Sequence, residues 1–258
     1  MYRFHLAVLL TAALCLSGCG SAAQSGSSVT SPVQSGQNGG VSTAPVKVVS
    51  DIHKMTNWSS CSGDCSGEPG TDATYSMTQS ISSPSLTGSA IEFHISSGTA
   101  WNTALWWKQV GGNDAITRYL YELSFYVADP GAGQALEFAV NQNASGWRYE
   151  YATQCDYRGS GTWRVWDHNS QRWYTSGKQC PEPVANQWNR MAWELERTSD
   201  NKVRFIAVTL NGQRSEVNMS FDAIPASGSG IDVAFQMDSI STPRPWSVWV
   251  DDIKLSQW

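Results

Sequence analysis

Aromatic and arginine side chains are interleaved through the segment 141–174. The chain contains 13 tryptophans. A flat indole ring can pack in a core, or several exposed rings can form a platform on which a ligand stacks. The aromatic and charged residues that give this segment its character are Trp147, Arg148, Tyr149, Tyr151, Asp156, Tyr157, Arg158, Trp163, Arg164, Trp166, Asp167, Trp173 and Tyr174.

These aromatic residues occupy both odd and even positions of the predicted strands, and therefore both faces. Successive residues of a strand point to opposite faces, so Trp147 and Tyr149 share one face and Arg148 lies on the other. The adjacent pair Trp106 and Trp107 must likewise point in opposite directions. A strand in a two-sheet sandwich has only one inward face, so some of these rings are expected outside the core.

The sequence predicts that these residues lie on β-strands. Short runs with a period of two are separated by Gly, Asn, Asp, Ser and Pro, and no amphipathic helix is found from residue 50 onward. Asn211-Gly212 is a strong hairpin dipeptide. Many short strands with regular turns indicate a sandwich or barrel. The expected strands are 90–95, 103–110, 118–127, 136–140, 147–153, 162–166, 172–174, 189–197, 203–210, 231–237 and 247–255.

Composition excludes some functions. Charged residues make up 15% of the 258-residue chain, and the net charge is -5. A mildly acidic chain lacks the basic surface that nucleic acid requires, so no nucleic-acid partner is expected. No apolar run beyond the extreme N-terminus is long enough to span a bilayer.

The N-terminus resembles a lipoprotein signal. Arg3 precedes the apolar run 6–16, which ends in Leu16-Ser17-Gly18-Cys19, similar to a bacterial lipobox. The resemblance implies a signal peptide over 1–18 and lipidation of Cys19, which makes the membrane a partner through the lipid anchor only. The alternative is an ordinary signal peptide with a chance cysteine. Residues 19–45 are small and polar, which predicts a flexible tether. The expected location is the cell envelope, at the outer membrane or cell surface.

Four cysteines remain in the predicted exported domain, and they are expected to form two disulfides. Three pairings are open. The pairs Cys61–Cys65 and Cys155–Cys180 are favoured because each brackets a local, turn-rich excursion.

Two stretches of the last third resemble known jelly rolls. The run 187–194 with Val203-Arg204-Phe205 and Leu210-Asn211-Gly212 is similar to concanavalin-A-like domains, including laminin-G-type lectins. The run 249–255 resembles the closing strand of such domains and of carbohydrate-binding modules. The resemblance implies an all-β fold over 46–258, an antiparallel two-sheet jelly-roll sandwich.

In these families one sheet faces a sugar chain, with rings stacked on pyranose C–H faces and polar side chains reading the hydroxyls. The resemblance therefore implies a polysaccharide or oligosaccharide partner and non-catalytic glycan binding. The alternatives are that the rings pack in the interior, or that the protein is an envelope adhesin that binds protein. The expected binding residues are Trp147, Tyr149, Trp163, Trp166 and Trp173, with Arg148, Asn141 and Asp156 as polar readers.

A second alternative is a polysaccharide hydrolase or lyase. Laminarinase-type glucanases carry E-[IL]-D-[IVF]-x-x-E on one strand, and the nearest match here places Glu137 at the nucleophile position. Ala139 replaces the central Asp, and Asn141 falls near the acid/base position. Without a second carboxylate in reach there is no proton donor, so a non-catalytic role is favoured.

The closing run also contains Asp251 and Asp252. In many jelly-roll glycan modules an Asp of this strand holds a structural calcium, and oxygen ligands suit that ion. The resemblance thus gives the hypothesis of calcium at Asp252, and no other cofactor is expected.

Overall fold

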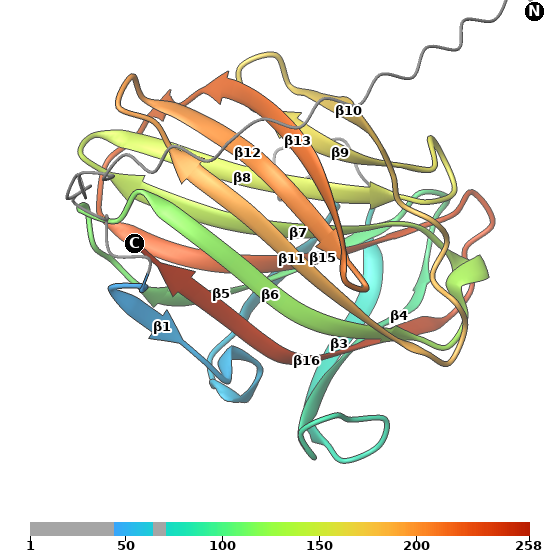
Figure 1. The fold of residues 1–258 in the computed structure, drawn as a ribbon. Coiled ribbons are helices and arrows are strands. Elements are labelled where there is room, and N and C mark those ends of the chain that lie inside the picture. The colour runs from blue at the N-terminus through green and yellow to red at the C-terminus, as the bar shows by residue number, and fades with distance from the viewer. Residues whose placement is uncertain (1–43, 64–70) are drawn as a thin grey trace, which may run out of the picture. The chain divides into compact units, whose positions relative to one another are not determined.

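The computed structural model describes residues 44–63 and 71–258, and these residues form two packed antiparallel sheets of eight strands each (Figure 1). Sheet 1 has the order β13-β12-β11-β6-β16-β4-β3, with β1 paired to β16. Sheet 2 has the order β10-β9-β8-β7-β15-β5-β2, with β14 paired to β8. The predicted antiparallel two-sheet sandwich is confirmed.

The described residues are almost wholly strands and loops, with short 3-10 turns that include η1 (Ile52–Lys54) and η3 (Pro130–Ala132). The strands are β1 (Lys47–Val49), β2 (Ser59–Ser62), β3 (Ala73–Ile81), β4 (Ala90–Gly98), β5 (Thr103–Gly111), β6 (Arg118–Val127), β7 (Gly133–Ala144), β8 (Trp147–Asp156), β9 (Thr162–Asp167), β10 (Arg172–Gln179), β11 (Trp188–Arg197), β12 (Lys202–Leu210), β13 (Gln213–Asp222), β14 (Ile224–Pro225), β15 (Gly230–Ser239) and β16 (Trp246–Gln257).

Every expected strand is present, and β6 has the predicted bounds. The predicted hairpin at Asn211-Gly212 joins β12 to β13, and both residues have positive φ, 51° and 83°. Sequence reasoning missed β1, β2, β3, β13 and β14. These strands are short, or lie at sheet edges with few fully buried positions, so their apolar signal is weak.

A continuous series of aromatic side chains in contact with one another fills the space between the sheets. Trp106 packs on Phe93, which contacts Phe235 at 4.8 Å between centroids. The series of contacts continues from Phe235 through Phe138 to Trp163. Trp163 packs edge-on against Trp193 of the other sheet, with 5.4 Å between the ring centroids. Much of the tryptophan excess is therefore core packing, which matches the large apolar area that each ring buries.

A disulfide joins Cys155 at the end of β8 to Cys180 just beyond β10, as the spacing favours, with 5.6 Å between the Cα atoms. Cys61 is also disulfide-bonded. Cys65, Cys19, the predicted signal peptide 1–18 and almost all of the predicted tether 19–45 lie outside the described residues. In the described part of the chain, no helix has the length and apolar character needed to cross a membrane.

Asp251 of β16 fastens two peripheral segments to sheet 1. Its Oδ2 accepts hydrogen bonds from Ser85 Oγ at 2.7 Å, from the Leu86 N–H at 2.7 Å and from the Thr87 N–H at 3.0 Å. Its Oδ1 lies 2.8 Å from Thr87 Oγ1 and 3.1 Å from His53 Nε2. The carboxylate and the imidazole are fully buried. Asp251 thus ties η1 and the β3–β4 loop to the closing strand.

Among the described residues, no set of calcium ligands is assembled around Asp252. Asp252 is exposed, and its neighbour Asp251 is surrounded by O–H and N–H donors rather than by oxygen ligands. Across 44–63 and 71–258, no group of three or more His, Cys, Asp or Glu side chains could hold a metal ion.

Candidate ligand-binding groove

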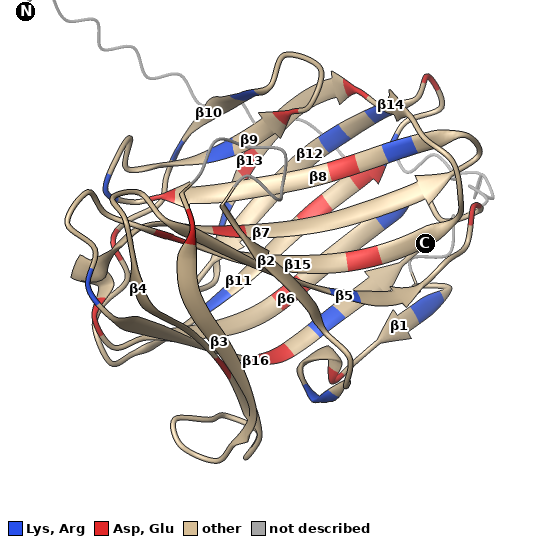
Figure 2. Cartoon of the chain, turned by 180° about the vertical axis from the view of Figure 1, so that it is seen from behind, with Lys and Arg blue, Asp and Glu red and all other residues tan. Residues whose placement is uncertain are grey.

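The outer face of sheet 2 carries the chemically rich side chains of the molecule. On β15 the odd positions from Ile231 to Met237 are buried in the core, so Asp232, Gln236 and Asp238 point the other way. The same alternation turns Arg148 and other polar residues of β8 outward. Figure 2, which looks at the molecule from behind, shows acidic positions on the neighbouring strands β7, β8 and β15.

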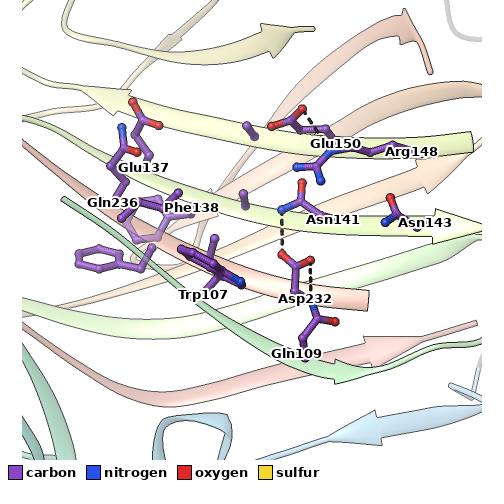
Figure 3. A pocket seen from close by; sticks show the side chains of 15 residues that line it. Trp107, Gln109, Glu137, Phe138, Asn141, Asn143, Arg148, Glu150, Asp232 and Gln236 are labelled. Atoms are coloured by element: carbon purple, nitrogen blue, oxygen red, sulfur yellow. Dashed lines mark hydrogen bonds and ion pairs between the residues drawn. The ribbon is translucent and has the colours of Figure 1, made fainter. Parts of the chain in front are cut away.

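A hollow of about 330 Å³ lies over the middle of this face (Figure 3). Its floor is a row of small side chains in direct register: Ala234 pairs with Ala139, and Ala139 pairs with Ala152. Trp107 of β5 continues the row beyond Ala234 and lines the hollow. Methyl groups between longer neighbours leave a trough that crosses the strands.

A second hollow of about 510 Å³ continues from the first, because Glu137 and Gln236 line both. Its aromatic lining includes Trp166 of β9 and Trp173 of β10, which pair in register and lie 5.3 Å apart between centroids. The Arg164 guanidinium lies 5.7 Å over the Trp173 ring. The two hollows together are called the groove below.

A carboxyl pair lies where the two hollows meet. Asp238 hydrogen-bonds to Glu137. Its carboxyl oxygens also accept hydrogen bonds from Gln154 Nε2 and Gln236 Nε2, each at 3.0 Å. Gln154 Nε2 donates to Glu137 as well, while Gln154 Oε1 accepts the Arg164 Nε–H at 2.8 Å. Burial raises the pKa of Asp238 to about 6, although the hydrogen bonds from Glu137, Gln236 and Gln154 oppose that shift.

Replacing Glu137 with glutamine should raise stability at alkaline pH. The pKa of Asp238 lies above its unfolded value of 3.8. Its contribution to stability is therefore fully present below pH about 4 and lost as the pH rises through about 6. Glu137 can donate to Asp238 only while it keeps its proton, whereas the amide of Glu137→Gln donates an N–H at any pH. We expect the Tm to rise by about 2–6 °C at pH 8 and to be unchanged near pH 4. An equal shift at both pH values would show that the stability gain does not depend on the protonation of this carboxyl pair.

The far end of the first hollow holds a second set of acidic groups. Asp232 accepts Asn141 Nδ2 at 2.8 Å and Gln109 Nε2 at 3.2 Å. Burial raises the pKa of Asp232, and these amide hydrogen bonds oppose the shift. On β8, Glu150 Oε2 lies 2.6 Å from His168 Nδ1. Burial disfavours ionisation of Glu150, but His168 and a nearby arginine outweigh it, so its pKa is lowered.

Five of the residues predicted from sequence lie in the groove. Trp166 and Trp173 form its aromatic pair, Asn141 and Arg148 line the first hollow, and Glu137, the weak catalytic candidate, lies at the junction. They come from β7, β8, β9 and β10, which the antiparallel register brings side by side.

The other predicted binding residues do not line the groove. Tyr149 and Trp163 are buried core residues, and Trp147 packs against the core, because all three belong to the inward phase of their strands. Asp156 is buried and accepts the Ser160 N–H at 2.7 Å and Gln134 Nε2 at 2.9 Å. Its hydrogen bonds hold the β8–β9 turn, so these four predicted residues lie outside the groove.

Sequence reasoning did not select several other groove residues, among them Trp107, Asp232, Gln236 and Asp238. A signal for them exists. The run 231–238 alternates apolar residues with Asp, Ala, Gln and Asp, and Trp107 is adjacent to Trp106, which the core takes. The reasoning followed aromatic density instead, and in this fold aromatic density also marks the core.

No protein-family model matches this chain, and no curated protein does. Solved structures with a similar fold include a carbohydrate-binding module of the β-sandwich superfamily, 11% identical with a TM-score of 0.44. That match covers 79% of this chain and 58% of the other. A family 11 carbohydrate-binding module from Clostridium thermocellum, in complex with a β-1,3-1,4-mixed-linked tetrasaccharide, is 16% identical over 83% of this chain and 97% of its own, with a TM-score of 0.42. An alginate lyase in complex with alginate trisaccharide is 10% identical over 82% and 98%, with a TM-score of 0.45.

Proposed function

We propose that this protein binds a glycan chain, without cleaving it, in the groove across sheet 2. The observation that carries the proposal is the in-register row of alanines between Trp107 on one side and the Trp166–Trp173 pair on the other. The row runs across the strands, so a ligand lying on it spans several of them, about 4.8 Å apart each. An extended chain fits that shape.

The chemistry of the lining suits a sugar. A pyranose has apolar C–H faces, which an indole ring or a floor of methyl groups can cover, and hydroxyls at its edge. The polar groups beside the alanine row are amides and carboxyls held in place by one another, such as Asp232 with Asn141 and Asp238 with Gln236. Such fixed donors and acceptors read hydroxyl positions at little cost in side-chain entropy.

The carboxyl geometry favours binding over hydrolysis. Glycosidases hold their two carboxyls about 5–5.5 or 6.5–9.5 Å apart, on either side of the scissile bond. Glu137 and Asp238 instead hydrogen-bond to one another. Glu150 and Asp232 lie two strands apart, and the separation of about 9.6 Å between their backbones is close to the upper end of the inverting range. However, His168 lowers the pKa of Glu150 and makes it a weak base.

Truncating one aromatic wall tests the proposal. Trp107→Ala and Trp173→Ala should each weaken glycan binding about tenfold or more, the usual cost of removing an aromatic anchor. The measurement is affinity electrophoresis and calorimetry on mixed-linkage β-glucan, glucomannan, galactomannan and xylan. Trp249→Ala is the matched control, because Trp249 is half-buried beside Tyr126 on the outer face of sheet 1.

Three outcomes would contradict the proposal. The first is that no glycan binds, and the second is that both groove variants bind as well as the control variant. The third is release of reducing ends or unsaturated products by the wild type, which would make the protein a hydrolase or lyase.

We also propose that the groove is displayed at the cell surface. Cys19 would carry the lipid, and residues 20–45 would hold the sandwich away from the membrane. The residue pattern of the signal and tether supports this. Mass spectrometry of the mature N-terminal peptide should find a diacylglyceryl group on Cys19. A mature N-terminus elsewhere, with an unmodified thiol, would leave an exported protein without an anchor.

A further inference from the structure

We propose that Asp232 makes the groove select glycans that carry no acidic groups, so that neutral chains bind and polyuronates are turned away. This inference rests on the proposed function, because it names the ligand class of the same groove. It makes Asp232 a specificity-determining residue that acts partly by repulsion.

Asp232 presents its carboxylate to the first hollow, and the nearby Arg148 favours its ionised form but contacts Glu150 instead. Its Oδ1 accepts Asn141 Nδ2 at 2.8 Å and its Oδ2 accepts Gln109 Nε2 at 3.2 Å, and both donors are neutral amides. Within the described residues Asp232 makes no ion pair. Figure 3 shows the carboxylate held between these two amides on adjacent strands. The hydrogen bonds fix its position and leave its negative charge in place.

The charges around Asp232 also favour exclusion of anions. The first hollow is lined by three carboxyl groups, those of Glu137, Glu150 and Asp232, and by one arginine, Arg148. Arg148 Nε lies 3.6 Å from Glu150 Oε2, and His168 Nδ1 contacts the same oxygen, so the one arginine of the lining already faces a carboxylate. A carboxylate or sulfate entering this hollow therefore meets net negative charge in a partly buried site, where screening is weak.

The amides of the hollow point to a ligand that donates hydrogen bonds. Asn141 is 9% exposed, and its Nδ2 donates to the Asp232 carboxylate. This bond defines the orientation of the amide, so the other terminal atom is the oxygen. Asn141 Oδ1 and Asn143 Oδ1 are buried and have no hydrogen-bond partner among the described residues, and the Arg148 Nε–H of the same lining is also without one. Figure 3 places the Asn141 oxygen on the Arg148 side of the hollow. A sugar hydroxyl can donate to these oxygens and also accept from the Arg148 N–H, whereas ionised carboxylates and sulfates have no proton to give.

The test compares one glycan with and without charge. The probes are mixed-linkage β-glucan and glucomannan, each also oxidised so that its primary hydroxyls become carboxylates, with the full-length protein at pH 8. The wild type should bind the neutral form about tenfold or more tightly than the oxidised form. Asp232→Asn keeps the side-chain shape, and it should narrow that ratio mainly by strengthening binding of the oxidised glycan.

The control is Glu194→Gln, which removes one charge from the outer face of sheet 1, where Glu194 is held by Arg214 at 2.7 Å. It should leave the ratio unchanged. Equal affinity of the wild type for both forms, or the same ratio in Asp232→Asn as in the wild type, would overturn the inference and leave glycan binding intact. Failure to bind any neutral glycan would instead remove the proposed function, and this inference with it.

Discussion

Replacing Asp251 with asparagine should lower the free energy of unfolding by about 3–5 kcal/mol, the effect of removing one partner from a buried charged network. Oδ2 accepts three hydrogen bonds, and Oδ1 contacts Thr87, His53 and the Asp252 N–H. Either orientation of the new amide therefore sets an NH2 group against O–H or N–H donors. Urea unfolding at pH 7 measures the loss.

The pH dependence of this loss has a defined sign. Burial by itself raises the pKa of Asp251, but hydrogen bonds from Thr87, Ser85 and Leu86 outweigh it and lower the pKa to about 2. Stability from the ionised carboxylate is therefore present above pH about 4 and is lost as the pH falls through about 2. The gap between wild type and Asp251→Asn should shrink over that interval.

Asp252→Asn is the matched control, because it makes the same chemical change one residue away. Asp252 is exposed and has a φ of 51°, a conformation that asparagine tolerates. We expect a change within about 0.5 kcal/mol. If both variants lost the same stability, the hydrogen-bond network around Asp251 would not be the cause.

Replacing Ala139 with leucine should abolish measurable glycan binding, a loss of about 100-fold or more. Ala139 is the middle of the alanine floor, paired with Ala234 on one side and Ala152 on the other. A leucine side chain there would fill the trough that a sugar ring needs. The residue faces away from the core, between the buried Phe138 and Val140, so the fold should persist.

Calorimetry with the best-binding glycan of the panel measures this effect, and circular dichroism checks the fold. Ala192→Leu is the control, since Ala192 lies between the buried Met191 and Trp193 on the outer face of sheet 1. It makes the same change in side-chain volume on the opposite side of the sandwich. Unchanged affinity in Ala139→Leu would place the ligand elsewhere on the molecule.

Strand periodicity was predictable because it is a local property. In β6 the residues Tyr119, Tyr121, Leu123, Phe125 and Val127 alternate with polar or half-buried positions, and all five are buried. The same alternation predicted that Trp106 and Trp107 point opposite ways, and the structure places Trp106 in the core and Trp107 at the groove.

The sequence also separated the two faces of β8 correctly, but it predicted ligand-binding residues on both faces. The face that carries Trp147 and Tyr149 is the core face. Arg148 and its neighbours of the other phase line the groove. A strand pattern defines two faces, and when both carry aromatic and polar residues it does not say which one a second sheet covers.

The sequence by itself determined that the chain is an all-β sandwich, where most of its strands run, and which side chains of each strand share a face. Only the tertiary structure decided that β15 lies between β7 and β5 and brings Asp232 and Asp238 beside Asn141 and Glu137. These partners lie about 90 to 100 residues apart in the chain. The physical reason is that periodicity is set by residues close together in the sequence. A groove depends instead on how strands that are far apart in the sequence pair with one another.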